Sequence, residues 1–251
     1  MPDLAPVAVF DSGLGGLSVL KYLRARMPHE DFLYYGDNAN APYGIRPRAE
    51  IEALTLAAAD KLMAYRPKAL VVACNTATGA ALEALQQALP IPVIGIQPAL
   101  KAAQALRQQG DILVLATPAT LKAARYQALA AQYGQHSIPL PAPGLMDYVE
   151  RGELAGAGLQ AFLGELFRPY LDKTIDVVVL GCTHYPFLSA AIQPFFPQAR
   201  LIDDSPRVAD ELTQALRDRD ALAEGPADGK VTLLSSGGEE AIARMRVLLD
   251  S

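Results

Sequence analysis

Ala69-Leu-Val-Val-Ala-Cys-Asn-Thr-Ala-Thr78 is an apolar run that ends at a cysteine and continues in small hydroxyl and amide residues. A similar stretch lies downstream, Asp176-Val-Val-Val-Leu-Gly-Cys-Thr-His-Tyr-Pro186. Short valine-rich runs of this kind are typical of strands that are buried on both faces of a parallel sheet. Cys74 and Cys182 are the only two cysteines of the chain, so each cysteine is predicted to stand where such a strand ends.

Outward from these two stretches, apolar runs of strand length alternate with amphipathic runs of helix length. Strands are predicted at Pro6–Phe10, Asp31–Tyr35, Leu70–Ala73, Pro92–Ile96, Asp111–Ala116, Asp176–Leu180, Ala199–Asp203 and Lys230–Ser235. Helices are predicted at Leu14–Met27, Arg48–Tyr65, Thr78–Leu89, Ala99–Gln109, Ala119–Tyr133, Leu154–Leu171, Ser205–Asp218 with Ser205 as its cap, and Glu239–Leu249. Continuous apolar strands separated by helices predict an α/β fold with mainly parallel sheets.

The two cysteine stretches also indicate a weak internal repeat. Two similar α/β units facing one another would bring the two strand ends to opposite sides of one cleft, where ligands of such sheets bind. Coincidence is the alternative, because a strand followed by small residues is common in α/β proteins. The repeat alone leaves both interpretations open.

Composition limits the classes of function. The chain of 251 residues is 51% hydrophobic with a net charge of −5, so it can bury a large core and carries no basic stripe for nucleic acid. No apolar run approaches the roughly 18 residues that a membrane span needs. The N-terminal residues lack the basic and apolar regions of a signal peptide. We therefore expect a cytoplasmic protein with no nucleic-acid or membrane partner, whose thiols stay reduced.

Free cysteines are frequently inert core residues. Both cysteines here precede a helix start, where amide groups carry partial positive charge and lower a thiol pKa from about 8.5. His184 lies two residues after Cys182 and can polarise a nearby acid or base. Because both cysteines of the chain occupy matched polar contexts, reactive thiols are favoured over inert ones.

Other polar residues follow predicted strands. Asp11-Ser-Gly-Leu-Gly-Gly16 has Ser18 where a dinucleotide fingerprint needs its third glycine, so we interpret it as a tight turn with free amides and a carboxylate. Tyr43 and Gly44 can lie over a ligand or form an ordinary turn. Three small hydrogen-bonding residues suit the charged groups of an amino acid, although helix capping alone would also explain them: Asn75, Thr76 and Thr183. Ser12 and Thr117 likewise follow predicted strands, where ligands of such sheets bind.

Four motifs together resemble the cofactor-independent glutamate racemases of the aspartate/glutamate racemase superfamily. They are Val9-Phe-Asp-Ser-Gly-Leu-Gly-Gly16, Tyr35-Gly-Asp-Asn-Ala-Asn-Ala-Pro-Tyr-Gly44, Ala73-Cys-Asn-Thr-Ala77 and Gly181-Cys-Thr-His-Tyr-Pro186. The likeness covers nearly the whole chain. It departs from the family pattern at Gln97, Ala116 and Asp204.

The resemblance implies that Cys74 and Cys182 are catalytic and that Asp11, His184 and Glu150 assist them. It implies substrate contacts from Asp11, Ser12, Tyr43, Gly44, Asn75, Thr76, Thr183 and His184. It implies two α/β domains around a cleft, residues 1–97 with 207–251 and an inserted domain of residues 98–206. It further implies glutamate as the small-molecule substrate, no cofactor or metal, a role in peptidoglycan synthesis and, since the family is often dimeric, a homodimer.

Racemisation removes the proton on Cα and returns one to the opposite face. Two groups on opposite sides do this economically, one thiolate as base and one thiol as acid. Two other classes stay open. A cysteine hydrolase or thiol transferase would use Cys182 with His184 and leave Cys74 idle, and a binding module would need neither thiol. Aspartate is the alternative substrate within the racemase class.

Overall fold

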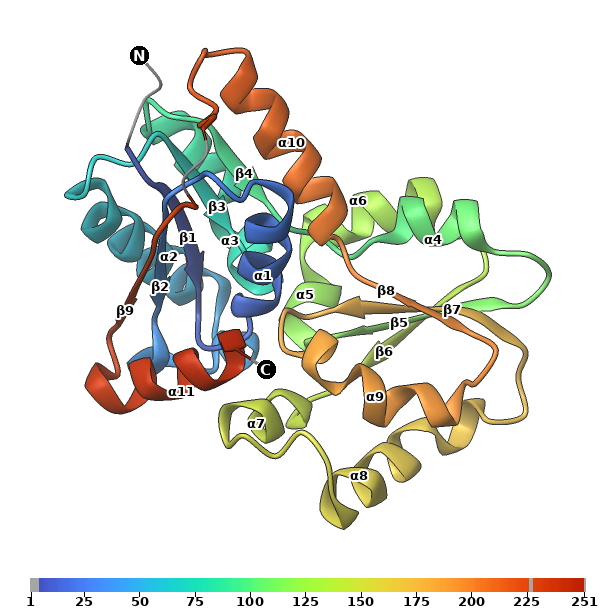
Figure 1. Ribbon diagram of the computed structural model, residues 1–251. Coiled ribbons are helices and arrows are strands. Elements are labelled where there is room, and N and C mark those ends of the chain that lie inside the picture. Colours follow the sequence, from blue (N-terminus) through green and yellow to red (C-terminus); the bar gives the residue numbers. More distant parts are fainter. Residues whose placement is uncertain (1–4, 226–227, 251) are drawn as a thin grey trace.

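The computed structural model describes residues 5–225 and 228–250. The expectation that the chain has no export signal rests partly on residues 1–4, which lie outside the described residues. Figure 1 shows two α/β units side by side, each built on its own sheet. All strand pairs are parallel, so the predicted α/β fold class is confirmed.

The larger sheet, called sheet A here, has five strands. Their spatial order is β4 (Val93–Gly95), β3 (Ala69–Val72), β1 (Val7–Asp11), β2 (Phe32–Gly36) and β9 (Val231–Ser235). Its central strand β1 is buried at every residue, which explains why this segment is apolar without alternation. Strand β9 returns from the far end of the chain to pair with β2.

Sheet B has four strands. Their spatial order is β6 (Ser137–Pro141), β5 (Asp111–Ala116), β7 (Ile175–Gly181) and β8 (Arg200–Ile202). The chain therefore leaves sheet A after β4, builds the whole of sheet B, and then returns to complete sheet A. The two sheets match the predicted pair of units with one inserted in the other, while the boundaries at residues 97/98 and 206/207 stay a prediction.

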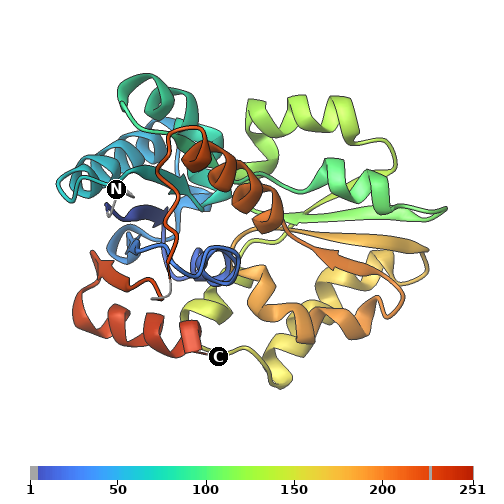
Figure 2. The same ribbon diagram turned by 45° about the horizontal axis from the view of Figure 1, so that its top comes forward.

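Helices cover both faces of sheet A. Val7 and Val9 pack toward α1 (Leu17–Arg26), α10 (Ser205–Arg217) and α11 (Gly238–Asp250), whereas Ala8 and Phe10 pack toward α2 (Arg48–Met63) and α3 (Asn75–Ala88). Alternate residues of a strand point to opposite faces, so each face of β1 has its own set of helices. Figure 2 shows these two layers with the sheet between them.

Sheet B is covered in the same way. One face packs on α4 (Leu100–Leu106) and α6 (Ala124–Tyr133), and the other on α7 (Leu145–Glu150), α8 (Ala157–Phe167) and α9 (Ser189–Ile192). Helix α5 (Pro118–Lys122) follows β5. Short 3₁₀ turns complete the chain: η1 (Asn38–Asn40), η2 (Tyr43–Ile45), η3 (Arg168–Tyr170), η4 (Tyr185–Leu188) and η5 (Gln193–Phe195).

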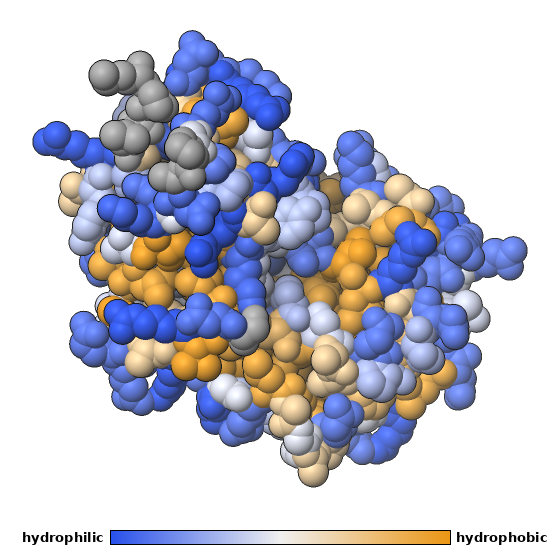
Figure 3. Space-filling view, in the orientation of Figure 1, coloured by the Kyte–Doolittle hydropathy of each residue, from blue (hydrophilic) through white to orange (hydrophobic). Residues whose placement is uncertain are grey.

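One hydrophobic cluster extends across both units. It contains Val9 and Leu20 from the sheet A unit together with Leu113 and Tyr185 from the sheet B unit, all of them buried. The units are therefore packed against each other over a shared apolar core. On the face seen in Figure 3, hydrophilic side chains surround apolar areas on both units.

The sequence-based predictions differ from the structure in several places. Strand β6 and helices α7 and α9 were not predicted, and the helix predicted at Ala119–Tyr133 is divided by extended backbone at Ala123. Helix α3 begins at Asn75 rather than Thr78. Ser205 is not a cap: it is the first residue of α10, and its amide donates to Oδ1 of Asp203 at 2.7 Å. Within the described residues, no helix is long and apolar enough to cross a membrane.

Candidate active site

The predicted site residues gather where strands of both sheets end. Asp11 ends β1, Cys74 follows β3, Thr117 follows β5, and Cys182 follows β7. A narrow pocket lies between these ends, with free space of about 10 Å³, enough for roughly one water molecule. Ten of the predicted residues line it: Ser12, Tyr43, Gly44, Cys74, Asn75, Thr76, Thr117, Cys182, Thr183 and His184. Met146, which was not predicted, also lines it.

Both thiols reach this one pocket from different sheets. Cys74 comes from the sheet A unit and Cys182 from the sheet B unit, and their residues are 5% and 7% exposed. They are free thiols. The sequence left open whether the matched cysteines were a coincidence. The geometry supports the other interpretation, that both cysteines of the chain converge on one pocket.

Cys74 is the N-cap of α3. Its Sγ accepts from the amide of Ala77 and lies against Oγ of Ser12, each at 3.4 Å. These contacts favour the thiolate, as the helix start predicted. Burial outweighs them and, with the nearby Asp11 carboxylate, raises the pKa of Cys74 to about 12. The expectation of a lowered pKa is therefore wrong for Cys74, because desolvation exceeds the helix contribution.

Cys182 has a different partner. Its Sγ lies 3.6 Å from Nδ1 of His184, and Nε2 of the same ring lies 2.7 Å from Oε1 of Glu150. Oε1 of Glu150 also accepts from the amide of Leu14 at 2.8 Å, and Asn38 donates to Oε2 at 3.4 Å. Thiol, imidazole and carboxylate thus form one chain, which reaches from the pocket across to the sheet A unit.

The ionisation of His184 and Glu150 follows from this pairing. Burial disfavours the charged imidazolium, but hydrogen bonds to Cys182 and Glu150 outweigh burial and raise the pKa of His184 well above its usual value. Burial likewise opposes the charged form of Glu150, and the contacts with His184 outweigh it, so the pKa of Glu150 is lowered. The pair is therefore an imidazolium next to a carboxylate near neutral pH.

Asp11 stands behind the pocket and does not line it. Its Oδ1 accepts from the amide of Gly13 at 2.8 Å, and its Oδ2 accepts from Oγ1 of Thr183 at 3.0 Å. Burial raises the pKa of Asp11, opposed by the charge of His184 and by these hydrogen bonds. The carboxylate thus orients Thr183, which does line the pocket.

The glycines of the Asp11–Gly16 loop are explained by close approach. A Cβ on Gly13 would overlap the carboxylate of Glu150, and one on Gly15 would overlap Nδ1 of His184 and Oγ1 of Thr183. The backbone of this loop therefore lies in close contact with the residues that support Cys182, and only glycine leaves room for this contact. It is not the nucleotide turn that its first two glycines resemble.

Hydroxyl groups join the two units beside Cys74. Oγ1 of Thr76 lies 2.9 Å from Oγ1 of Thr117 and 3.2 Å from Oγ1 of Thr120. Thr117 is also the N-cap of α5, so this residue both caps a helix and lines the pocket. Next to them, Oδ1 of Asn75 is buried and has no hydrogen-bond partner among the described residues. Such an acceptor in a pocket wall is placed to receive a donor from a ligand.

Tyr43 forms another part of the wall. Its hydroxyl donates to Oδ2 of Asp37 at 2.6 Å, and Asn40 donates to the same carboxylate. Burial and this hydrogen bond raise the pKa of Tyr43, so the phenol stays neutral. Gly44 lies against Thr117, where a Cβ would meet the threonine side chain.

The sequence and the structure both have known relatives. Residues 18–213 match the Asp/Glu/Hydantoin racemase family. The chain is 43% identical over 236 residues to a protein named glutamate racemase from Clostridium perfringens, covering 92% of this chain and 91% of that protein. The chain belongs to the glutamate racemase family.

Solved structures of the family have the same fold. The glutamate racemase of Thermus thermophilus, in complex with beta-chloro-D-alanine, superposes with a TM-score of 0.84 at 36% identity and covers 98% of this chain and 94% of its own. That of Francisella tularensis, in complex with D-glutamate, gives a TM-score of 0.84 at 29% identity, with coverage of 98% and 94%. The prediction that this chain is an enzyme, an amino-acid racemase of the isomerase class, is confirmed.

The departures from the family pattern lie outside the pocket. Asp204 accepts from the amide of Gln97 at 3.0 Å and pairs with Arg207, which also donates to the carbonyl of Gly95 at 2.7 Å. These contacts tie together the two chain segments that connect the sheets. Ala116 is the last residue of β5. None of the three departures lines the pocket.

Two contributors to the site were not predicted. Met146, on α7, is the one aliphatic side chain among the pocket residues, and Asn38 holds Glu150 from η1. Asn38 was quoted within a family motif without a role, and nothing in the pattern around Met146 marked it. No group of three or more His, Cys, Asp or Glu side chains in the described part of the chain could hold a metal ion.

Proposed function

We propose that this enzyme interconverts L-glutamate and D-glutamate with Cys74 and Cys182 as its two bases. The observation that carries the proposal is that the two thiols of the chain line one narrow pocket from opposite units. One thiolate removes the proton on Cα, and the opposite thiol delivers its own proton to the other face. The Cα–H bond breaks as an S–H bond forms on one cysteine, and the S–H bond of the other cysteine breaks as the new Cα–H bond forms, so no net proton is gained or lost.

The family resemblance implies which enantiomer each thiol deprotonates. Cys74 acts as base on D-glutamate, and Cys182 acts as base on L-glutamate. When Cys182 is the thiolate, His184 supports it at 3.6 Å as an imidazolium, and Glu150 keeps that imidazolium charged. When Cys74 is the thiolate, the Ala77 amide and the Ser12 hydroxyl support it. Each base thus has its own stabilising groups.

The pKa of Cys74 sets a requirement on the bound state. A thiol with a pKa of about 12 is almost entirely protonated near neutral pH, so binding must favour its thiolate before D-glutamate can react. The ammonium group of the substrate supplies a positive charge close to the sulfur, which lowers a thiol pKa. Substrate binding therefore activates its own base.

The intermediate needs donors around the α-carboxylate, since a thiol-only scheme has no electron sink. Polar groups of the pocket wall supply them: Ser12, Asn75 and Thr183. The free Oδ1 of Asn75 accepts from the α-ammonium. Thr76 and Thr117, joined by a hydrogen bond of 2.9 Å, are placed to bind the side-chain carboxylate, with Tyr43 and Gly44 covering it. The mechanism requires no cofactor or metal.

The pocket must open for the substrate to enter. Its free space of about 10 Å³ holds roughly one water molecule, whereas glutamate has several times that volume. Because the wall is shared between the two units, parting the units enlarges the pocket, and closing them excludes water from the carbanion. We place this reaction in the cytoplasm, where it supplies D-glutamate for peptidoglycan.

One assay tests the proposal. Dialysed, chelator-treated enzyme is incubated with L-glutamate or with L-aspartate, and the circular dichroism of the amino acid is followed. We expect loss of signal with glutamate, much slower loss with aspartate, and no requirement for added pyridoxal phosphate, metal or nucleotide. Equal or greater kcat/KM with aspartate would overturn the substrate, and activity only after a cofactor is restored would overturn the two-thiol scheme.

The same assay on the cysteine variants separates the alternative classes. A racemase loses activity when either cysteine is replaced, whereas a cysteine hydrolase or thiol transferase loses it only with Cys182. A binding module would keep its ligand affinity with both thiols replaced. Size-exclusion chromatography with light scattering tests the homodimer.

A further inference from the structure

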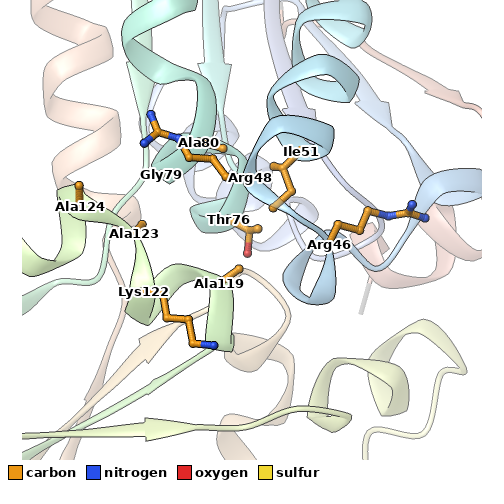
Figure 4. A pocket seen from close by; sticks show the side chains of 10 residues that line it. All are labelled: Arg46, Arg48, Ile51, Thr76, Gly79, Ala80, Ala119, Lys122, Ala123 and Ala124. Atoms are coloured by element: carbon orange, nitrogen blue, oxygen red, sulfur yellow. The ribbon is translucent and has the colours of Figure 1, made fainter.

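A second cavity lies next to the catalytic pocket, between α2, α3 and α5. Its volume is about 390 Å³, within the range of small-molecule sites. Figure 4 shows its lining, with Thr76 at the centre and helices of both units around it. Thr76 lines both this cavity and the catalytic pocket, so the two spaces share one wall.

The charge of the cavity has one sign. Among the described residues, three basic side chains line it, Arg46, Arg48 and Lys122, and no acidic side chain does. Arg46 is partly neutralised, because it pairs with Glu50 and donates to the carbonyl of Asn40 at 3.0 Å. Arg48 and Lys122 form no ion pair with any other described residue. Two cationic groups are therefore left to attract an anion.

These two cations come from different units. Arg48 is the first residue of α2 on the sheet A unit, and Lys122 is the last residue of α5 on the sheet B unit. The rest of the lining is mainly aliphatic, for example Ile51, Ala80 and Ala119. A cavity with cationic side chains over an apolar wall fits a small molecule that has anionic ends and methylene groups between them.

The sizes of the two spaces indicate an order of events. The catalytic pocket holds roughly one water molecule, whereas the neighbouring cavity can hold a molecule the size of glutamate. A substrate can therefore occupy the cavity before the units part, and it reaches the thiols past Thr76 when they do. Cationic walls raise the local concentration of an anionic ligand, by tenfold or more in favourable cases.

We propose that this cavity is a capture site for the dicarboxylate substrate, in which Arg48 and Lys122 hold glutamate beside Thr76 until the catalytic pocket opens. The proposal rests on glutamate racemisation as the function. When entry is slower than the chemical step, kcat/KM rises with the fraction of enzyme that already holds substrate in the cavity. Chemistry itself does not involve either cation, so kcat is independent of them.

The experiment compares two double variants with the same change in charge. Arg48→Gln with Lys122→Gln removes the two cations of the cavity. Lys173→Gln with Arg200→Gln is the control, because both residues are exposed on the sheet B unit and line neither cavity. Thermal unfolding of each variant checks that the fold is retained, and kcat and KM are measured for both enantiomers at low and high ionic strength.

We expect KM of the cavity variant to rise about tenfold at low ionic strength with kcat within about twofold of wild type. The difference should shrink at roughly 0.5 M salt, where charges are screened beyond a few ångströms. The control variant should stay within about twofold throughout. Equal KM values for the two variants at low ionic strength would overturn the proposal, as would a loss confined to kcat.

Inorganic phosphate provides an equilibrium probe of the same cavity. We expect it to compete with glutamate in the wild type and the control at matched ionic strength, and to compete several-fold more weakly in the cavity variant. Phosphate that inhibits all three proteins equally would place its site elsewhere and overturn the proposal. If the wild type fails to racemise glutamate at all, the proposed function fails. If the wild type is active but the cavity variant and the control variant have the same KM, only the capture site is refuted.

Discussion

Cys74 and Cys182 line the same pocket from opposite sheets, but they are supported by different chemistry. Cys74 is held by neutral groups, the amide of Ala77 and the hydroxyl of Ser12, each at 3.4 Å. Cys182 lies 3.6 Å from His184, whose ring is bound to Glu150 at 2.7 Å. One thiol therefore depends on a helix terminus, and the other on an ion pair.

This difference shows that a reaction that is symmetric in its products can be catalysed by an asymmetric site. The equilibrium constant between enantiomers fixes the ratio of the two kcat/KM values, so the asymmetry cannot appear there. It appears in which proton transfer limits the rate. Primary isotope effects with Cα-deuterated glutamate therefore report on each cysteine separately, and the predictions below use them.

The largest effect is expected from replacing either thiol. Cys74→Ser and Cys182→Ser should each lower kcat/KM by about 10³ or more, because serine is a far weaker base near neutral pH; this equals roughly 4 kcal/mol of barrier. The isotope effect should grow for D-glutamate in Cys74→Ser and for L-glutamate in Cys182→Ser. Wild type in deuterated water should place solvent deuterium in the product while unreacted substrate stays protiated. Identical patterns in both variants would contradict the two-base assignment.

Glu150→Gln should lower kcat by roughly 10², about 2.7 kcal/mol. The glutamine keeps an acceptor for the Leu14 amide but loses the charge that raises the pKa of His184. The pKa of His184 should fall, so the imidazolium is lost at a lower pH. The high-pH limb of the kcat/KM profile should therefore shift to lower pH for both L-glutamate and D-glutamate. The isotope effect should grow for L-glutamate only.

Glu153→Gln is the matched control for Glu150→Gln. Glu153 is an exposed carboxylate three residues along the chain and pairs with Arg151. Its replacement should leave the pH profile and both isotope effects unchanged. A shift of the high-pH limb in Glu153→Gln as large as in Glu150→Gln would show that net charge, and not the contact with His184, controls the profile.

Alkylation of the single-thiol proteins should differ by roughly 30-fold at neutral pH. In Cys182→Ser, the remaining Cys74 has a pKa of about 12 and little thiolate, partly offset because a more basic thiolate is a stronger nucleophile. Its rate with iodoacetamide should still be rising at pH 11. Cys182 in Cys74→Ser lies beside the His184 imidazolium and should react faster. Saturating glutamate should slow both, and equal rates with and without it would place the thiols outside the site.

The smallest effect is expected from Ser12→Ala, at about tenfold in kcat. The hydroxyl lowers the pKa of Cys74, so its loss makes that thiol a poorer source of thiolate. The isotope effect should grow for D-glutamate, opposite to Glu150→Gln, and Ser12→Thr should restore most of the activity. A larger effect for L-glutamate would mean that Ser12 serves the other cysteine.

The sequence predicted eight of the nine strands of the described chain because their apolar runs are continuous. It missed β6, whose segment Ser137-Ile-Pro-Leu-Pro141 carries two prolines. Proline lacks an amide donor and is tolerated on an edge strand, and β6 is the edge of sheet B. The break at Ala123 has no glycine or proline to mark it, so no local pattern could have predicted two helices there.

At the site, sequence patterns predicted the residues at strand ends but not how they are layered. Asp11 was predicted to contact the substrate and, with Glu150, to assist the thiols; Asp11 lies behind Thr183, and Glu150 reaches Cys182 through His184. Only the tertiary fold brings α7 across to the Leu14 amide. Met146 could not be predicted, because an isolated methionine on a six-residue helix has no distinguishing spacing.

The return of β9 to sheet A has a consequence for biosynthesis. A ribosome makes the strands in chain order, so β1 to β4 emerge first and the whole of sheet B emerges before β9. Until then β2 is an open edge with unpaired backbone groups, which is the kind of surface on which nascent chains aggregate. The inserted unit, being continuous in the chain, can fold while the first sheet still waits for its last strand. Chaperone demand during synthesis should therefore concentrate on the sheet that holds Cys74.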